Sequence, residues 1–151
     1  MKKISAGLLM YRIKNGVTEV LLVHPGGPFY KNKDDGVWDI PKGESEDHEK
    51  DLLEVAKREF EEEIGWKPVG DFKSIGTCER PNKIVHAWTF QGDCDPATIK
   101  SNTCMVEWPP KSGKQIEILE VDRAGFFDMS TAKQKVWPYL VPLIEMFERM
   151  M

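Results

Sequence analysis

Residues 43–66 read GESEDHEKDLLEVAKREFEEEIGW. Apolar residues recur through this stretch at the spacing of one helix face, which predicts an amphipathic helix over about residues 49–64. That face comprises Leu53, Ala56, Phe60 and Ile64. Gly65 suits the left-handed residue that commonly follows a helix, and Asp47 or Ser45 suits the N-cap. The rest of the chain is organised around this loop and helix.

Three glutamates of the stretch share a second face of the predicted helix. Glu59, Glu62 and Glu63 have the spacing i, i+3 and i+4, which brings their carboxylates together. Like charges this close cost roughly 0.2–0.5 kcal/mol per pair, so their grouping indicates a cation to be held. Oxygen ligands suit hard divalent ions. The alternative is an acidic helix face that is only solvated, which is common on protein surfaces.

The run Arg58-Glu59-Phe60-Glu61-Glu62-Glu63-Ile64-Gly65-Trp66, with Gly43 before it, resembles the Nudix hydrolase signature. In that signature a glycine loop precedes a helix carrying Arg-Glu, an apolar residue, a pair of glutamates and a closing glycine. The resemblance implies that Glu59, Glu62, Glu63 and the carbonyl of Gly43 bind Mg²⁺ or Mn²⁺.

The resemblance also implies catalytic roles within the same helix. Glu62 or Glu63 is a candidate for the base that deprotonates the attacking water. Arg58 is expected to be a buried or half-buried partner that orients a glutamate, because its planar guanidinium suits that contact. The alternative for Arg58 is a surface pair with Glu54 or Glu62.

The spacing between the loop and the helix departs from the signature by one residue. Arg58 is the fifteenth residue after Gly43, where the pattern has the fourteenth. The first signature glutamate is therefore Glu49 counted from Gly43, but Lys50 counted back from Arg58. We expect the extra residue in the loop at 44–48, since loops absorb one residue at little cost and an extra helical residue would turn the preceding turn by about 100°. On that view neither Glu49 nor Lys50 binds the metal, and Glu49→Ala should leave kcat within about threefold.

Several residues outside the helix are candidates for substrate contacts. Lys42 adjoins the glycine loop and could meet a phosphate, and Trp38 could stack on a base, although tryptophans in apolar strands more often lie in the core. Three further glutamates are candidates for a distal base or metal ligand: Glu107, Glu117 and Glu120.

The remaining patterns predict an α/β fold. Expected strands are residues 3–11, 19–24, 37–40, 72–79, 84–91, 104–108 and 116–119, and expected C-terminal helices are 131–136, capped by Ser130, and 139–150. The resemblance implies a Nudix-type α/β/α sandwich with a mixed sheet and the signature loop-helix-loop. We expect residues 1–151 to form a single domain, since the length suits one core.

Composition narrows the function classes. The net charge of −4 argues against an extended nucleic-acid surface, which needs clustered Lys and Arg. Cys78, Cys94 and Cys104 lack the spacing of a zinc site or a disulfide framework, which predicts a reducing, cytoplasmic location. No targeting segment or membrane span is evident in the sequence.

These observations lead to one functional hypothesis with stated rivals. The resemblance implies a metal-dependent pyrophosphohydrolase acting on a nucleoside diphosphate linked to another moiety, a nucleoside triphosphate or dinucleoside polyphosphate in the first place. ADP-ribose or a nucleotide sugar is an alternative substrate. A non-catalytic nucleotide-binding module of the same fold is the rival from another class. The oligomeric state is left open.

Overall fold

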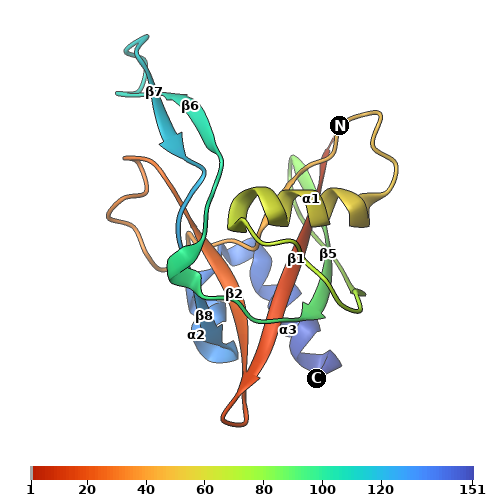
Figure 1. Ribbon diagram of the computed structural model, residues 1–151. Helices are drawn as coiled ribbons and strands as arrows, with labels where there is room; N and C mark the ends of the chain where they lie inside the picture. Colours follow the sequence, from red (N-terminus) through yellow and green to blue (C-terminus); the bar gives the residue numbers. More distant parts are fainter. Residues whose placement is uncertain (1) are drawn as a thin grey trace.

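The computed structural model describes residues 2–151 and is built on a mixed sheet (Figure 1). Five strands lie in the order β4-β5-β1-β2-β8, and β3 pairs with β1 beside them. Their bounds are β1 Lys3–Lys14, β2 Val17–Pro25, β3 Lys42–Glu44, β4 Lys73–Arg80, β5 Lys83–Gln91 and β8 Val121–Asp128. The β1–β5 pair is parallel and the other pairs are antiparallel.

Helices cover both faces of the sheet, which gives the expected α/β/α arrangement. Helix α1 (Leu52–Ile64) lies on one face, and α2 (Met129–Lys135) and α3 (Val141–Met150) lie on the other, with the 3-10 turn η2 (Pro138–Leu140) between them. Side chains of β1 alternate between the two layers, as a pleated strand requires. Leu8 packs with Phe60 of α1, whereas Leu9 packs with Phe147 of α3.

A hairpin stands apart from the main sheet. Strands β6 (Thr103–Glu107) and β7 (Gln115–Leu119) form their own two-stranded sheet, which follows the short 3-10 turn η1 (Pro96–Thr98) and extends away from the body (Figure 1). Both strands alternate between half-buried and exposed residues, so one face of the hairpin is sheltered.

The loop before α1 differs from the sequence prediction. The helix begins at Leu52 with Asp51 as its N-cap, rather than near residue 49 with Asp47 or Ser45. The Asp51 carboxylate accepts hydrogen bonds from two free N–H groups of the first turn, at 3.1 and 3.3 Å. Helix α1 is continuous from Leu52 to Ile64, so the extra residue lies before the helix and not within it.

Other boundaries also move. Lys42–Glu44, predicted as loop, is strand β3, while residues 37–40, predicted as a strand, make only isolated bridges. Asp128 rather than Ser130 caps α2, accepting from the Thr131 N–H at 2.8 Å. The three cysteines are free. Within residues 2–151, no helix is long and apolar enough to span a membrane.

Candidate active site

Strand β3 places the glycine loop directly against α1. Gly43 pairs with Ala6 of β1, which fixes the backbone of β3 beneath the helix. A Cβ atom on Gly43 would lie only 2.0 Å from Cδ of Glu59 and 2.3 Å from its Oε2. Only glycine permits this approach, so the Glu59 carboxylate rests on the Gly43 backbone.

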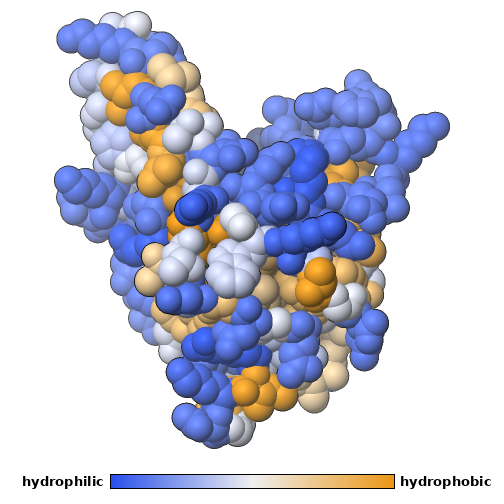
Figure 2. Space-filling view, viewed as in Figure 1, coloured by the Kyte–Doolittle hydropathy of each residue, from blue (hydrophilic) through white to orange (hydrophobic). Residues whose placement is uncertain are grey.

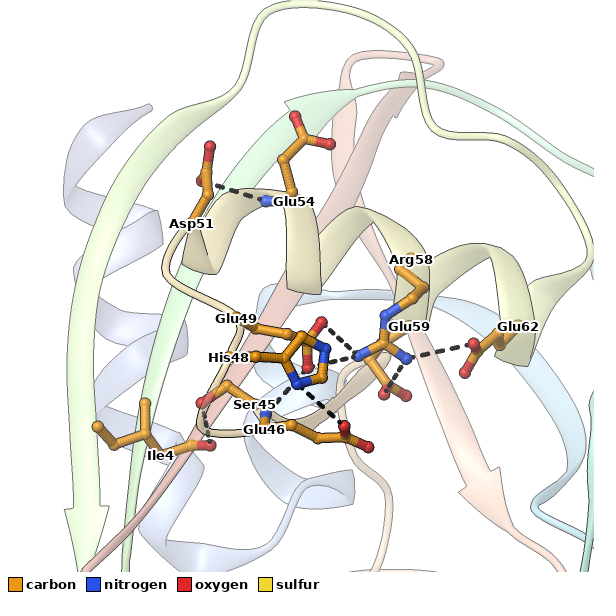
Figure 3. Close-up of polar contacts among 10 residues, drawn as sticks. All are labelled: Ile4, Ser45, Glu46, His48, Glu49, Asp51, Glu54, Arg58, Glu59 and Glu62. Carbon is orange, nitrogen blue, oxygen red and sulfur yellow. Dashed lines mark hydrogen bonds and ion pairs between the residues drawn. The ribbon is translucent and has the colours of Figure 1, made fainter.

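Arg58 draws three carboxylates together at the surface (Figure 3). Its Nη1 donates to Glu59 Oε1 at 3.1 Å and to Glu62 Oε1 at 3.2 Å, and its Nη2 donates to both carboxylate oxygens of Glu49 at 3.0 and 3.1 Å. The Arg58 side chain is 41% exposed, more open than the sequence analysis expected. Its contact with Glu59 is of the kind that the resemblance implies, and its i,i+4 contact with Glu62 is the surface pair given as the alternative.

Glu63 turns away from Arg58 toward the glycine loop. Its Oε2 accepts a hydrogen bond from the Lys42 backbone N–H at 3.0 Å. Burial, followed by the nearby charge of Asp39, raises the pKa of Glu63 well above its ordinary value, and Lys42 only partly opposes this. Burial and the charge of Glu62 also raise the pKa of Glu59. Both carboxyl groups would be stabilised in their charged form by an added cation.

The described side chains, residues 2–151, hold no group of three or more His, Cys, Asp or Glu arranged to share a metal ion. Glu59 and Glu62 converge on one nitrogen, and Glu63 stands beside them on the Lys42 amide. This donor set is all oxygen, which hard divalent ions prefer. The residues fit such an ion, because Arg58 engages only Oε1 of Glu59 and Oε1 of Glu62 and leaves Oε2 of each carboxylate to a cation.

Glu120 lies far from helix α1 in the sequence, but the fold brings it near the carboxylates of Glu59 and Glu62. It follows the hairpin, where its N–H donates to the Asn102 carbonyl at 2.9 Å and its carbonyl accepts from the Gly26 N–H at 3.0 Å. Burial and then the charge of Glu62 raise the pKa of Glu120. Glu120 is thus coupled to the helix carboxylates, and no spacing in the sequence could have singled it out.

A basic cavity of about 210 Å³ opens on the other side of β3. It is lined by Pro25, Tyr30, Val37, Asp39, Lys42, Arg80, Lys83, Trp137 and Tyr139. Lys42 Nζ lies 2.9 Å from Asp39 Oδ2. Burial by itself would lower the pKa of Lys42, but Asp39 and other neighbours outweigh it and raise the pKa, so Lys42 stays cationic. Lys42 thus touches Glu63 by its backbone and the cavity by its side chain.

Trp38 lies in the core and does not line this cavity. Only 4% of the residue is exposed, and its ring packs edge-on against His24 and Phe127 with centroids 5.2 and 5.1 Å away. Its Nε1–H donates to Asp34 at 2.7 Å. The aromatic residues at the cavity are instead Tyr30 and, from a segment about a hundred residues further along the chain, Trp137 and Tyr139.

A family model described as the NUDIX domain matches residues 1–139. The chain belongs to the Nudix family. Nudix hydrolases generally use divalent metal ions. Because the chain belongs to this family, it is a hydrolase. A comparison with curated proteins finds no match.

Solved Nudix structures share the fold at low sequence identity. An Ap4A hydrolase binary complex from C. elegans is 20% identical over 98% of this chain and 96% of its own, with a TM-score of 0.66. The NUDIX domain of Shewanella oneidensis NrtR complexed with ADP ribose is 16% identical over 100% and 90%, with a TM-score of 0.65. A MutT protein from Methanosarcina mazei Go1 is 22% identical over 99% and 94%, with a TM-score of 0.64.

Glu49 and Lys50, the two residues that compete for the first glutamate position of the signature, have different surroundings. Glu49 lies before the helix, in a turn where its N–H donates to the Glu46 carbonyl at 2.9 Å and its carboxylate accepts from the Glu46 N–H at 2.9 Å. From there it reaches Arg58 with both oxygens. Lys50, the other contender for the position, is exposed.

Proposed function

We propose that this Nudix hydrolase cleaves a phosphoanhydride bond in a nucleoside diphosphate linked to another moiety, with a nucleoside triphosphate or dinucleoside polyphosphate as substrate. The observation that carries the proposal is the convergence of Glu59 and Glu62 on one cationic nitrogen directly beside Gly43. Carboxylates grouped in this way gather positive charge, which polyphosphates need before a nucleophile can approach.

In this proposal, the carboxylates of Glu59, Glu62 and Glu63 and the carbonyl of Gly43 hold Mg²⁺ or Mn²⁺. The bound ion would neutralise phosphate charge and lower the pKa of a water molecule. Glu62 or Glu63 accepts the proton of the attacking water. Arg58 keeps Glu59 and Glu62 oriented, and Glu49 anchors Arg58 from the loop.

The basic cavity is the proposed site for the nucleoside and its phosphates. Lys42, Arg80 and Lys83 supply positive charge around it, and Tyr139 and Trp137 supply aromatic surface on which a base can stack. Its position supports this role, because the Lys42 amide contacts Glu63 on the far side of the same strand. Trp38, being buried, has no part in the proposal.

ADP-ribose is a second candidate substrate. The likeness to the NrtR domain complexed with ADP ribose favours it, although at 16% identity that likeness concerns the fold alone. In either case, the substrate is a small nucleotide rather than a long nucleic acid, in keeping with the net charge of −4.

The test is a panel of nucleotides assayed for product release with Mg²⁺, Mn²⁺ or excess chelator. The panel holds nucleoside triphosphates, a dinucleoside tetraphosphate, ADP-ribose and a nucleotide sugar. We expect turnover only with metal. Full turnover in chelator would refute the metal role. Binding without turnover would favour the non-catalytic module. The absence of both binding and turnover would favour the reading in which the acidic helix is only solvated.

A further inference from the structure

A second cavity, of about 320 Å³, lies between the β6–β7 hairpin and the loop at residues 26–30, and we call it the hairpin cavity. Its walls are mostly apolar and include Pro28, Phe29, Tyr30, Val106, Trp108 and Ile118. Figure 2 shows apolar residues along this arm of an otherwise largely hydrophilic face. None of the roles proposed above involves the arm, so the cavity has no assigned occupant.

The hairpin wall of this cavity is held rigid at its tip. A two-stranded hairpin is marginal by itself, so its tip needs bracing to present a fixed surface. Glu107 supplies that bracing, because its carboxylate oxygens accept from the Lys111 N–H at 2.9 Å and the Gly113 N–H at 3.1 Å. The Trp108 N–H donates to the Lys114 carbonyl at 2.9 Å. Trp108 therefore occupies a defined place.

The opposite wall is anchored to the core. Buried His24 places Nε2 2.6 Å from the Lys33 carbonyl oxygen and Nδ1 2.8 Å from Asp122 Oδ1. The Lys33 N–H donates to the Tyr30 carbonyl at 2.9 Å, which closes the turn of residues 30–33 directly after Phe29. Both aromatic walls are thus set before any ligand arrives, which lowers the entropy cost of binding.

The two walls touch at the base of the cavity and separate above it. A Cβ atom on Gly26 would lie 1.9 Å from the Leu119 carbonyl oxygen, and one on Gly27 would lie 2.8 Å from Cδ1 of Ile118. Higher up, the walls enclose the hollow instead of packing together, and Phe29 remains 54% exposed. An apolar hollow with fixed aromatic walls suits a flat ring.

The hairpin cavity adjoins the proposed nucleotide site at Tyr30, which lines both cavities. The Tyr30 ring lies 4.9 Å from Phe29 on one side and 6.2 Å from Trp137 on the other. Lys33 Nζ sits 3.6 Å from the Phe29 ring centroid and brings a cation to the rim. At the base of the hairpin, the Gly26 N–H donates to the Glu120 carbonyl at 3.0 Å.

We infer that the hairpin cavity binds a second nucleobase, so that the two cavities together select a dinucleoside polyphosphate over a mononucleotide. This inference rests on the proposed function. One base occupies the basic cavity and the other lies between Phe29 and Trp108, with the polyphosphate between them near the helix carboxylates.

The test compares two substrates of equal phosphate number, diadenosine tetraphosphate and adenosine 5′-tetraphosphate. Removing a stacking ring costs about 5- to 150-fold for the base it serves. Trp108→Ala should therefore lower kcat/KM by that factor for the two-base substrate and by less than about twofold for the one-base substrate. Trp108→Phe, which keeps a ring, should stay close to wild type. Met105→Ala, on the opposite, exposed face of the hairpin, is the matched control.

Equal losses on both substrates, or none on either, would overturn the inference while leaving the hydrolase proposal standing. Turnover of neither substrate by the wild-type chain would instead count against the hydrolase proposal. A titration then still decides the inference. Free adenosine should shift the indole N–H signal of Trp108 in NMR spectra saturably, Phe29→Ala should abolish that shift, and an unmoved Trp108 signal would refute the subsite.

Discussion

Gly43→Ala isolates the contact between the glycine loop and the carboxylate helix. Gly43 lies in strand β3, in an extended conformation that any residue adopts, so alanine is tolerated by the backbone itself. The new Cβ would lie 2.0 Å from Cδ of Glu59, whereas ordinary contacts begin near 3.4 Å. The Glu59 carboxylate must therefore retreat by about 1.4 Å, the difference between these distances.

A shift of this size should separate activity from stability. Misplacing a catalytic group by about 1 Å can cost roughly 100-fold, so kcat should fall by about that factor. The free energy of unfolding should change by less than ~1 kcal/mol, because the exposed Arg58–Glu59 pair contributes ~0.2–1 kcal/mol and replacing glycine stiffens the unfolded chain by a similar amount.

The assay pairs steady-state kinetics at varied Mg²⁺ with urea unfolding. Glu44→Ala, on the neighbouring exposed residue of the same strand, is the control and should keep full activity. The reasoning is refuted if Gly43→Ala turns over substrate normally. It is also refuted if the variant unfolds, because the carboxylate would then lack the freedom to move aside.

Three further expectations concern glutamates around the same site. Glu62→Gln should lower kcat by roughly 100-fold, the scale for losing a key electrostatic group, while Glu61→Gln on the exposed side of α1 should not; similar rates for the two variants would place the site elsewhere. Glu49→Ala should now cost about tenfold or more rather than the threefold expected from sequence, because it frees Arg58, and an unchanged rate would make Glu49 a bystander. Burial raises the pKa of Glu63 above its ordinary value of 4.5, so the metal-free protein should lose stability as the pH rises from 4.5 toward the raised pKa. Glu63→Gln should remove this pH dependence of the urea midpoint. An unaltered pH dependence would contradict the burial argument.

The helix was predictable because its signals are local. Periodic apolar residues indicated α1, and Gly65 ends it in the left-handed conformation, donating to the Glu61 carbonyl at 2.7 Å. The start was wrong because the sequence offers several N-cap residues in a row. The turn that Glu46 and Glu49 close with two hydrogen bonds keeps Glu49 out of the helix, and Asp51 becomes the cap.

Features that depend on distant segments were not predictable. Strand β3 has three residues and no periodic pattern, so only its pairing with Ser5–Gly7 of β1 defines it. The basic cavity gathers Lys42, Arg80 and Tyr139 from three separate segments, and no spacing links them. Trp38 sits in a stretch of alternating apolar residues, which predicts a strand with two faces. The alternation does not predict which face the rest of the chain buries.

The alternation within β3 determines where this chain can tolerate insertions and deletions. Lys42 directs its side chain into the basic cavity, and Gly43 leaves room for Glu59 on the opposite face. A one-residue slip along β1 would exchange these two faces and press a lysine side chain onto the Glu59 carboxylate. A length change between Ile40 and Gly43 would therefore destroy the site, whereas the extra residue present a few positions later leaves α1 intact. Homologues that vary in loop length should place their variation after this glycine and not before it.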